Sequence, residues 1–549
     1  MSTQVVEGHA ATARPTIQLA EGVHILEAAH TARAAELLTP EAVSLLAELS
    51  RELEPERRQL LEARKTRQAA FDAGEVPKYL DRQSEAVQGD WKVAPLPQDL
   101  LRRRVEITGP VNSTKMVINM LSRTADGNRA DCAMLDFEDS MKPSWTNVVD
   151  GVHNVVGAAE GTLRHVEQAR PGRPEKAYQL DPNDMALIMV RARGLHLDES
   201  NILVDGTPVS GGLLDLALTW LHAAPELIER NKTPKYYIPK VEHYLEARWW
   251  NKAFNLLEAK LKVPVGTLRA TFLIETLPAA FQIEEILYEL REHAAGLNVG
   301  RWDKIFSDIK TLRFHKDRVM ADRASIGMNR PWMKHYAMRL IAICHNRGAS
   351  ALGGMAAFTP GRDPETRQAQ TDKVEADKRW EYAMGHDGCW VSHPYFIGTA
   401  MKAFPRDNQL DVMSALDDKY PDLLPQGSGP KTLIGLRTNV RVGIAYLEGW
   451  KNDIGCIAWD NLMEDLATLE ISRAQTWQWL HHEVTLDDGN AVTPEFVGSV
   501  FEEELRRIFE ELGPDVDRAA WTQAMEAARD LFLQEDFQEF LSLASDPVT

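Results

Sequence analysis

The segment GLNVGRWDKIF, residues 296–306, sets an apolar run with two glycines in front of a tryptophan and an acid, Asp303. Small and apolar residues in a short run are typical of a strand that is buried on both faces. A carboxylate at the end of such a strand is costly unless it is paired, hydrogen-bonded or bound to a cation. We therefore expect Asp303 to end a buried strand and to have a partner elsewhere in the chain.

Seven other runs of this kind occur from Arg102 onward, and most are separated by segments long enough for a helix, such as 278–293 and 331–346. This alternation is typical of parallel strands joined by crossover helices. Eight such units over about 300 residues predict a closed (β/α)₈ barrel of the α/β class. The eight runs are RRVEITGP, CAMLDFED, ALIMVRARG, YYIPKVE, RATFLIET, GLNVGRWD, SALGGMAAF and CWVSHP.

Helical patterns lie on both sides of the predicted barrel. Thr39 precedes a proline and a glutamate, as at a capped helix start, and a second helix is expected from about Pro55 to Gly74. Near the other end, Thr493 opens another capped helix after a proline- and glycine-rich stretch, 417–431, that predicts a linker. We predict three domains: a helical part over 1–100, the barrel over 101–410 and a second helical part over 411–549.

Composition narrows the class of protein. The net charge is −19, from 62 basic and 81 acidic residues, and the acids are dispersed, which argues against nucleic-acid binding. No run of 18 or more apolar residues predicts a membrane span. The four cysteines, Cys132, Cys344, Cys389 and Cys456, are far apart and suggest neither a disulfide framework nor a zinc site. We expect a cytoplasmic enzyme or binding protein.

In such a barrel the chemistry lies at the carboxyl ends of the strands. Glu275 and Asp303 are 28 residues apart, about one strand-to-strand repeat, so their carboxylates could converge. Two carboxylates completed by water are a usual way of holding Mg²⁺. The alternative, that each acid caps a helix or pairs with a basic side chain, stays open from the pattern alone.

Three further residues have both a functional and a structural interpretation. Arg191 and Arg193 alternate on one predicted strand and should share a face, where a substrate carboxylate or the nearby acids could neutralise them. For Arg193, a salt bridge to Asp136 or Glu138 is an equal alternative. Asp465 begins a predicted helix, and by itself the pattern favours an acid placed by the helix dipole.

A family resemblance separates these interpretations. REHAAGLNVGRWDKIF, residues 291–306, closely resembles the diagnostic segment of malate synthases. The similarity continues in the same order through VEITGP, DFEDS, VRARGLH, FLIETLPA, GGMAAF, GHDGCWVSHP and LMEDLATLEIS. The compact length resembles the isoform A type. One departure is Lys304, where the family usually has tyrosine, and we expect it to affect packing rather than chemistry.

The resemblance implies an acyltransferase of the glyoxylate cycle. Malate synthases condense acetyl-CoA with glyoxylate and hydrolyse the thioester to malate and CoA, with Mg²⁺ as cofactor. Their fold is a TIM barrel with an N-terminal helical clasp and a C-terminal helical plug domain, which agrees with the helical patterns on both sides of the barrel. The expected partners are these two small substrates, with no nucleic acid and no membrane. The oligomeric state is left open, with a monomer as one option.

The resemblance also implies roles for individual residues. Asp465 would be the catalytic base and Arg191 would stabilise the enolate. Glu275 and Asp303 would bind the metal, while Asp136 and Glu138 would hold metal-bound waters. The glyoxylate contacts would be Arg191, Glu275, Gly300, Arg301, Trp302 and Asp303, and those of acetyl-CoA would include Ser140 and Pro394.

Two alternatives remain. A malyl-CoA or citramalyl-CoA lyase-type enzyme shares the barrel and the metal-binding acid pair, but such lyases are much shorter chains without the plug domain that carries Asp465. A catalytically silent CoA-thioester-binding protein would have lost some of these catalytic positions. The catalytic and metal-binding residues named above are all present in the sequence.

Overall fold

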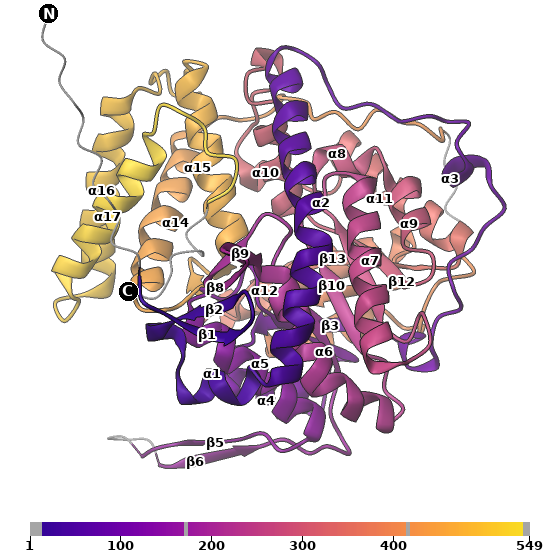
Figure 1. Ribbon diagram of the computed structural model, residues 1–549. Coiled ribbons are helices and arrows are strands. Elements are labelled where there is room, and N and C mark those ends of the chain that lie inside the picture. Colours follow the sequence, from indigo (N-terminus) through magenta and orange to yellow (C-terminus); the bar gives the residue numbers. More distant parts are fainter. Residues whose placement is uncertain (1–13, 170–173, 413–417, 542–549) are drawn as a thin grey trace, which may run out of the picture.

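Eight parallel strands close into a barrel at the centre of the protein (Figure 1). The computed structural model describes residues 14–169, 174–412 and 418–541. All eight runs predicted from the sequence supply barrel strands, so the predicted (β/α)₈ barrel is confirmed. In ring order the strands are β10 (Lys235–Ile238), β11 (Arg269–Ile274), β12 (Ala294–Val299), β13 (Ser350–Ala356), β14 (Gly388–Val391), β3 (Val105–Pro110), β4 (Cys132–Asp136) and β7 (Leu187–Arg191).

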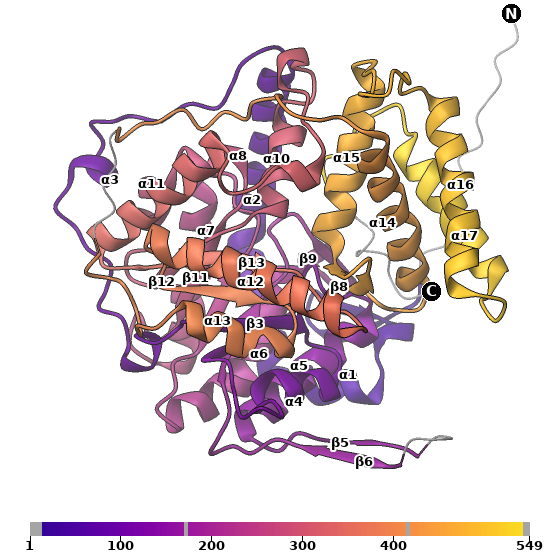
Figure 2. The same ribbon diagram turned by 180° about the vertical axis from the view of Figure 1, so that it is seen from behind.

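Helices surround the barrel, and their ends follow local sequence signals. One of them starts at a serine N-cap, Ser144, and ends at Gly161 in the left-handed region (φ 71°), which glycine adopts without a steric cost. Figure 2 shows the layer on the far side of the barrel. The barrel helices are α4 (Thr114–Leu121), α5 (Trp145–Glu160), α6 (Gly211–Glu229), α7 (Tyr244–Leu261), α8 (Leu277–Ala280), α9 (Ile283–Glu289), α10 (Trp302–Thr311), α11 (Pro331–Arg347), α12 (Pro364–Met384) and α13 (Ile397–Ala403).

The N-terminal clasp is dominated by one long helix, α2 (Pro40–Asp72), that packs on α6 and α7 (Figure 1). The sequence predicted two helices here, with a break before Pro55, and this was wrong. Pro55 removes one hydrogen-bond donor, but the helix continues because its buried face includes Leu53 and Leu60. Buried Arg64 on the same helix donates to the Lys240 carbonyl in the barrel at 2.8 Å. Tertiary contacts therefore outweigh the local signal.

The clasp is also not purely helical. Its first strands, β1 (Thr16–Ala20) and β2 (Val23–Leu26), join a hairpin inserted after β7, formed by β8 (Asp198–Val204) and β9 (Thr207–Ser210). The four strands form one sheet in the order β1-β2-β8-β9. This pairing fastens the N-terminal segment to the loop that follows Arg191. The remaining clasp helices are α1 (Ala32–Leu37) and α3 (Glu85–Gln88).

The C-terminal plug domain forms a helical layer beside the barrel (Figures 1 and 2). Its helix α15 packs against α10 of the barrel, so the two domains share an apolar cluster that includes Phe306 and Ile471. The plug elements are α14 (Leu433–Lys451), β15 (Ile457–Trp459), β16 (Leu462–Glu464), α15 (Leu466–His481), α16 (Pro494–Leu512) and α17 (Arg518–Phe532).

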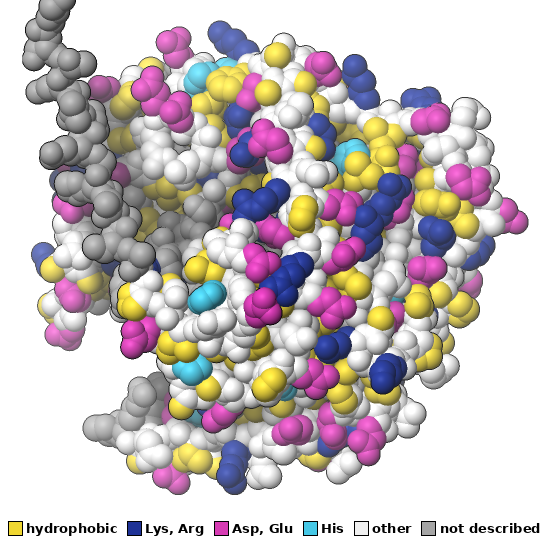
Figure 3. All heavy atoms as spheres, in the orientation of Figure 1, with side chains coloured by type: hydrophobic (Ala, Val, Ile, Leu, Met, Phe, Trp, Pro, Cys, Tyr) yellow, Lys and Arg dark blue, Asp and Glu magenta, His cyan; other side chains and the backbone are white. Residues whose placement is uncertain are grey.

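The surface carries interspersed charges. On the face drawn in Figure 3, acidic and basic side chains lie next to each other along α2 and around it. A second hairpin, β5 (Arg164–Glu167) with β6 (Lys176–Gln179), extends from one end of the barrel (Figure 1). Among the described residues, no helix is both long enough and apolar enough to cross a membrane.

Candidate active site

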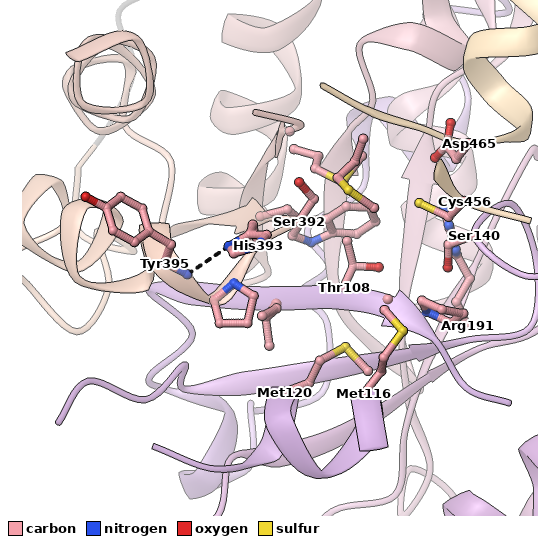
Figure 4. Close-up of a pocket in the computed structure, with 18 of the residues that line it drawn as sticks. Thr108, Met116, Met120, Ser140, Arg191, Ser392, His393, Tyr395, Cys456 and Asp465 are labelled. Atoms are coloured by element: carbon pink, nitrogen blue, oxygen red, sulfur yellow. Dashed lines mark hydrogen bonds between the residues drawn. The ribbon is translucent and has the colours of Figure 1, made fainter. Parts of the chain in front are cut away.

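A cavity of about 800 Å³ opens at the carboxyl ends of the barrel strands. Its inner wall includes Arg191, Glu275 and Asp303 from the barrel, and Asp465 with Cys456 from the plug domain. Figure 4 shows Asp465, Cys456 and Arg191 along one side of the cavity, contributed by different domains. The sequence-predicted residues from both domains therefore meet in one space.

Glu275 and Asp303 are brought together as the spacing predicted. Glu275 follows β11 and is 1% exposed, and its Oε1 accepts a hydrogen bond from the Lys240 amide at 2.9 Å. Asp303 lies in the first turn of α10, beyond the end of β12 at Val299, so the expectation that it ends the strand itself was wrong by a short turn. Burial, together with the charge of Asp303, raises the pKa of Glu275 to about 8.

Asp303 retains an oxygen that is not fully satisfied. Burial and the charge of Asp139 raise the pKa of Asp303, against the lowering effect of Lys240. Its Oδ1 makes no hydrogen bond, although the Lys240 ammonium lies 3.3 Å away as an ion pair. A buried carboxylate oxygen without a hydrogen-bond donor can be stabilised by a bound cation.

Arg191 is held in a two-pronged ion pair. Its Nε and Nη2 donate to the two carboxylate oxygens of Asp136 at 2.6 and 2.5 Å. Burial alone would raise the pKa of Asp136, but the charge and hydrogen bonds of Arg191 outweigh it, so this pKa is lowered. The Nη1 of Arg191 lies 3.4 Å from Glu138. Asp136 therefore fixes the guanidinium plane beside the cavity.

Arg193 does not share this position. The strand β7 ends at Arg191, and the guanidinium of Arg193 bonds Asp215 and Glu199 at 2.8 and 2.9 Å. The predicted shared face was therefore wrong; of the two alternatives left open for Arg193, a salt bridge is present, but its partners are Asp215 and Glu199 instead of Asp136 or Glu138. The chain leaves the strand geometry after Arg191, so the two-residue alternation no longer applies.

Lys240, like Asp139, belongs to this centre although sequence reasoning gave it no role. Its ammonium is within hydrogen-bonding distance of Glu138 and Asp139 and is 3.3 Å from Asp303. Its backbone is in the left-handed region (φ 51°), which is unusual for a lysine. A lysine just beyond the apolar run YYIP was the only available signal, because its partners come from distant strands.

Asp465 caps the helix that it begins. Its carboxylate accepts from the Thr468 amide at 3.3 Å, and the side chain is buried, with 7% exposed. Burial, then the charges of Asp139 and Asp303, raise its pKa well above the usual range of an aspartate. The structural interpretation as a first-turn acid is thus geometrically correct, but the same carboxylate also faces the cavity.

The loop that carries Asp465 is docked on the barrel by main-chain hydrogen bonds. The Leu466 amide donates to the Asp139 carbonyl at 3.1 Å, and the Met463 amide donates to the Ala357 carbonyl at 2.7 Å. These bonds place the start of α15 directly over strand ends β4 and β13.

Residues 300–302 line the cavity. The Gly300 amide donates to the Tyr336 hydroxyl at 3.1 Å, and the Arg301 guanidinium donates to the Ile326 carbonyl at 3.0 Å. The first amides of α10 have no partner within their helix. An anion bound here could therefore accept hydrogen bonds from the amides at the start of α10. The Arg301 guanidinium is already bonded to the Ile326 carbonyl.

The predicted CoA contacts lie at two points of the wall. Ser140 lies near the centre, where its hydroxyl donates to Asp136. Pro394 lines the cavity between His393 and Tyr395 in the chain, and Tyr395, which Figure 4 labels, is exposed. The cavity wall also includes Met116 and Met120, which the sequence reasoning did not select.

The donor set fits a hard divalent cation. Glu275 and Asp303 supply two carboxylates, and Glu138 and Asp139 each keep one buried oxygen without a hydrogen bond. Across the described ranges, no group of three or more His, Cys, Asp or Glu side chains has metal-site geometry. Two protein carboxylates with other ligands from water or substrate remain consistent with that finding.

Fold and site together define a TIM-barrel protein whose candidate active site is completed by a second domain. Sequence models of three malate synthase regions match the chain: the N-terminal domain over 22–84, the TIM barrel domain over 187–420 and the C-terminal domain over 430–546. The chain belongs to the malate synthase family. This family is known generally to use a divalent metal.

Individual relatives agree. The chain is similar to the malate synthase of Myxococcus xanthus, at 46% identity covering 93% of each chain. It is 42% identical to malate synthase A of Escherichia coli, over 92% of this chain and 95% of the relative. Similarity over more than nine-tenths of the chain, plug domain included, does not favour the lyase or silent-binding alternatives.

A solved complex of the Haloferax volcanii malate synthase with pyruvate and acetyl-CoA shows a weaker likeness. It is 15% identical, with a TM-score of 0.42, covering 77% of this chain and 98% of that one. At this score the two chains do not superpose closely enough for residues to be matched.

Proposed function

We propose that this enzyme condenses acetyl-CoA with glyoxylate and hydrolyses the resulting thioester, releasing malate and CoA. The acetyl methyl group loses a proton, its carbon bonds to the aldehyde carbon of glyoxylate, and water then cleaves the carbon–sulfur bond. Membership of the malate synthase family supports the reaction. The positions of the individual residues in the cavity support the roles proposed for them below.

Glyoxylate is proposed to bind at the inner end of the cavity. Its carboxylate would accept hydrogen bonds from the first amides of α10, because a helix N-terminus favours an anion. Arg191, held flat by Asp136, has its remaining Nη1 edge close to the acids of the site. A divalent cation held there by Glu275 and Asp303, proposed to be Mg²⁺, would make the aldehyde carbon more electrophilic.

The observation that carries the proposal is the position of Asp465. This acid is buried, comes from the plug domain and lines the same cavity as Arg191. A methyl proton next to a thioester is very weakly acidic, so its removal needs a base with a raised pKa and a cation beside the enolate oxygen. Asp465 is the proposed base and Arg191 the proposed cation.

Acetyl-CoA is proposed to enter through the outer part of the cavity. Met116, Met120 and Pro394 give this part an apolar wall along which the pantetheine arm can lie. Ser140, bonded to Asp136, stands where the thioester would approach Arg191. Arg191 would then contact both substrates at the carbon–carbon bond that forms.

The experiment is solvent exchange of acetyl-CoA methyl protons in deuterated buffer, together with malate formation, in Asp465→Asn. Asp460→Asn is the matched control, because Asp460 lies on the same plug loop and its carboxylate pairs with Arg441 outside the cavity. We expect exchange and turnover to be lost in Asp465→Asn and kept in Asp460→Asn. Equal, wild-type-like activity in both would refute the assignment of the base.

A further inference from the structure

The chain beyond α17 returns to the barrel. Residues 533–541 leave the plug domain core after Phe532 and run along α15, where the Trp477 indole donates to the Glu535 carbonyl at 3.0 Å. Phe537 packs on Trp477, with ring centroids 5.0 Å apart. We call residues 533–541 the C-terminal tail.

Phe540 of the tail is inserted between two barrel elements. Its ring stacks on His196 with centroids 4.4 Å apart and an interplanar angle of 30°. It also meets Phe306 edge-on at 5.6 Å, and the Lys310 ammonium lies 5.1 Å from its centroid. The next residue, Leu541, donates its amide to Glu470 on α15 at 2.6 Å.

The partners on helices belong to elements that carry a residue of the proposed site. Phe306 and Lys310 are on α10, which begins at the turn bearing Asp303. Glu470 is in the second turn of α15, whose N-cap is Asp465. The tail therefore contacts elements from both sides of the domain boundary.

His196 links the tail to the acid cluster from the loop after Arg191. A Cβ placed on Gly194 would lie 2.9 Å from the His196 ring and 3.9 Å from Glu138 Oε1. The imidazole and Glu138 therefore both lie close to Gly194. Burial, then the positive charge of Arg64, lower the pKa of His196 well below the ordinary value, so the ring that stacks on Phe540 is neutral.

The ring of Phe540 also covers charge. Lys310 pairs with Glu242 at 2.8 Å, and Glu242 lies 3.8 Å from Arg64 of the clasp. An aromatic ring over such a layer keeps water from it and strengthens the ion pairs beneath. If the tail detached, water would reach these ion pairs, and the first turns of α15 would lose the hydrogen bond between Leu541 and Glu470.

We infer that Phe540 is a positioning residue that fastens the plug domain to the barrel, and thereby sets Asp465 over the substrate. The inference rests on the proposed role of Asp465. Because Phe540 touches no substrate, its loss should impair the step that needs the plug domain and spare ligand binding at the barrel end.

The test uses three variants of the full chain. Phe540→Ala removes the ring, and Phe540→Leu keeps an apolar side chain of intermediate size. Phe509→Ala is the matched control: Phe509 is also half-buried in the plug domain, where its ring faces Arg518, 4.9 Å from the guanidinium carbon. Four readouts are needed: turnover, methyl-proton exchange, the Kd of glyoxylate with Mg²⁺ by calorimetry, and amide hydrogen exchange over 466–470.

For Phe540→Ala we expect turnover and methyl-proton exchange to fall about tenfold or more, since misplacement by about 1 Å can cost about 100-fold. The glyoxylate Kd should stay within about threefold of wild type, and amides 466–470 should exchange faster. Phe540→Leu should recover most of the turnover, and Phe509→Ala should keep it.

Three outcomes would overturn the inference: unchanged turnover in Phe540→Ala, equal losses in Phe540→Ala and Phe509→Ala, or loss of glyoxylate binding together with turnover. Asp465→Asn separates this failure from that of the proposed function. If Asp465→Asn stops proton exchange and Phe540→Ala does not, the base assignment stands and the positioning role falls. If Asp465→Asn still exchanges protons, the proposed function itself fails.

Discussion

The ammonium of Lys240 lies 3.3 Å from Oδ1 of Asp303, inside a group of buried carboxylates. The same ammonium contacts Glu138 and Asp139, and burial, which would lower its pKa, is outweighed by these acids, so the pKa is raised. Lys240 is therefore a permanent positive charge at the site proposed to hold a divalent cation.

Replacing Lys240 by Met should destabilise the metal-free protein. Removing one partner from a buried ion pair costs about 3–5 kcal/mol, because the other charge is left uncompensated. Mg²⁺ should recover part of the loss by supplying positive charge to the same acids. Urea unfolding with and without Mg²⁺ measures both effects. Lys304→Met, which breaks the buried pair with Asp308, is the control: equal recovery by Mg²⁺ in both variants would contradict the prediction.

Glu275→Gln should weaken Mg²⁺ binding by about 100-fold or more, because it removes one of two charged ligands while keeping the side-chain shape. The fold should persist, since a neutral amide costs less to bury than a carboxylate. Calorimetric titration with Mg²⁺ gives the affinity. The control is Glu285→Gln, a buried acid outside the cavity. Unchanged Mg²⁺ affinity in Glu275→Gln would exclude Glu275 as a ligand.

Mg²⁺ affinity should rise with pH up to about 8. The pKa of Glu275 is raised from 4.5 to about 8, so its carboxyl group holds a proton in the folded, metal-free protein across that window. Binding must displace this proton, which gives about a tenfold gain in affinity per pH unit. Without metal the sign is opposite: the unfolded state loses this proton while the folded state keeps it, so folding stability falls as pH rises from 4.5 to about 8. Calorimetry between about pH 6 and about pH 8 should show a shallower slope for Glu275→Gln, and equal slopes would contradict the assignment.

Gly300→Ala should displace Glu275. A Cβ on Gly300 would lie 2.6 Å from the Glu275 Cβ and 3.0 Å from its Oε2, closer than side chains can pack. Since a shift of about 1 Å at a reacting centre can cost about 100-fold, turnover should fall by about one to two orders of magnitude. Gly498→Ala, where a Cβ meets no atom within 4 Å, should leave turnover unchanged. Steady-state kinetics decide, and a fully active Gly300→Ala would show that the Glu275 position tolerates movement.

Arg191→Lys should lower turnover by about two orders of magnitude or more, on the scale of a lost oxyanion donor. Lysine keeps the charge but cannot bond both oxygens of Asp136 and still present a planar edge to substrate. Arg193→Lys is the comparison, because its bonds to Asp215 and Glu199 are structural, so thermal stability should fall more than turnover. A near-normal rate for Arg191→Lys would count against the proposed role.

The eight strands and the possible convergence of Glu275 with Asp303 were predictable because their signals are local, whereas the place of Asp465 in the site came only from the family resemblance. An apolar run between turns predicts a buried strand whatever surrounds it, and parallel strands bring their carboxyl ends to one edge of the barrel. The malate synthase segments then indicated which acids would meet. Helix capping at Asp465 was likewise a local property.

Tertiary structure alone decided which side chains became partners. Arg193 leaves the face of Arg191 because β7 ends between them, α2 continues through Pro55 because it lies on α6 and α7, and Phe540 meets His196 although 344 residues separate them. Lys240 enters the acid cluster through contacts with strands that are far apart in the chain. Periodicity describes each segment by itself, whereas the free energy of a buried charge or ring depends on the neighbours that the closed barrel and the plug domain place around it.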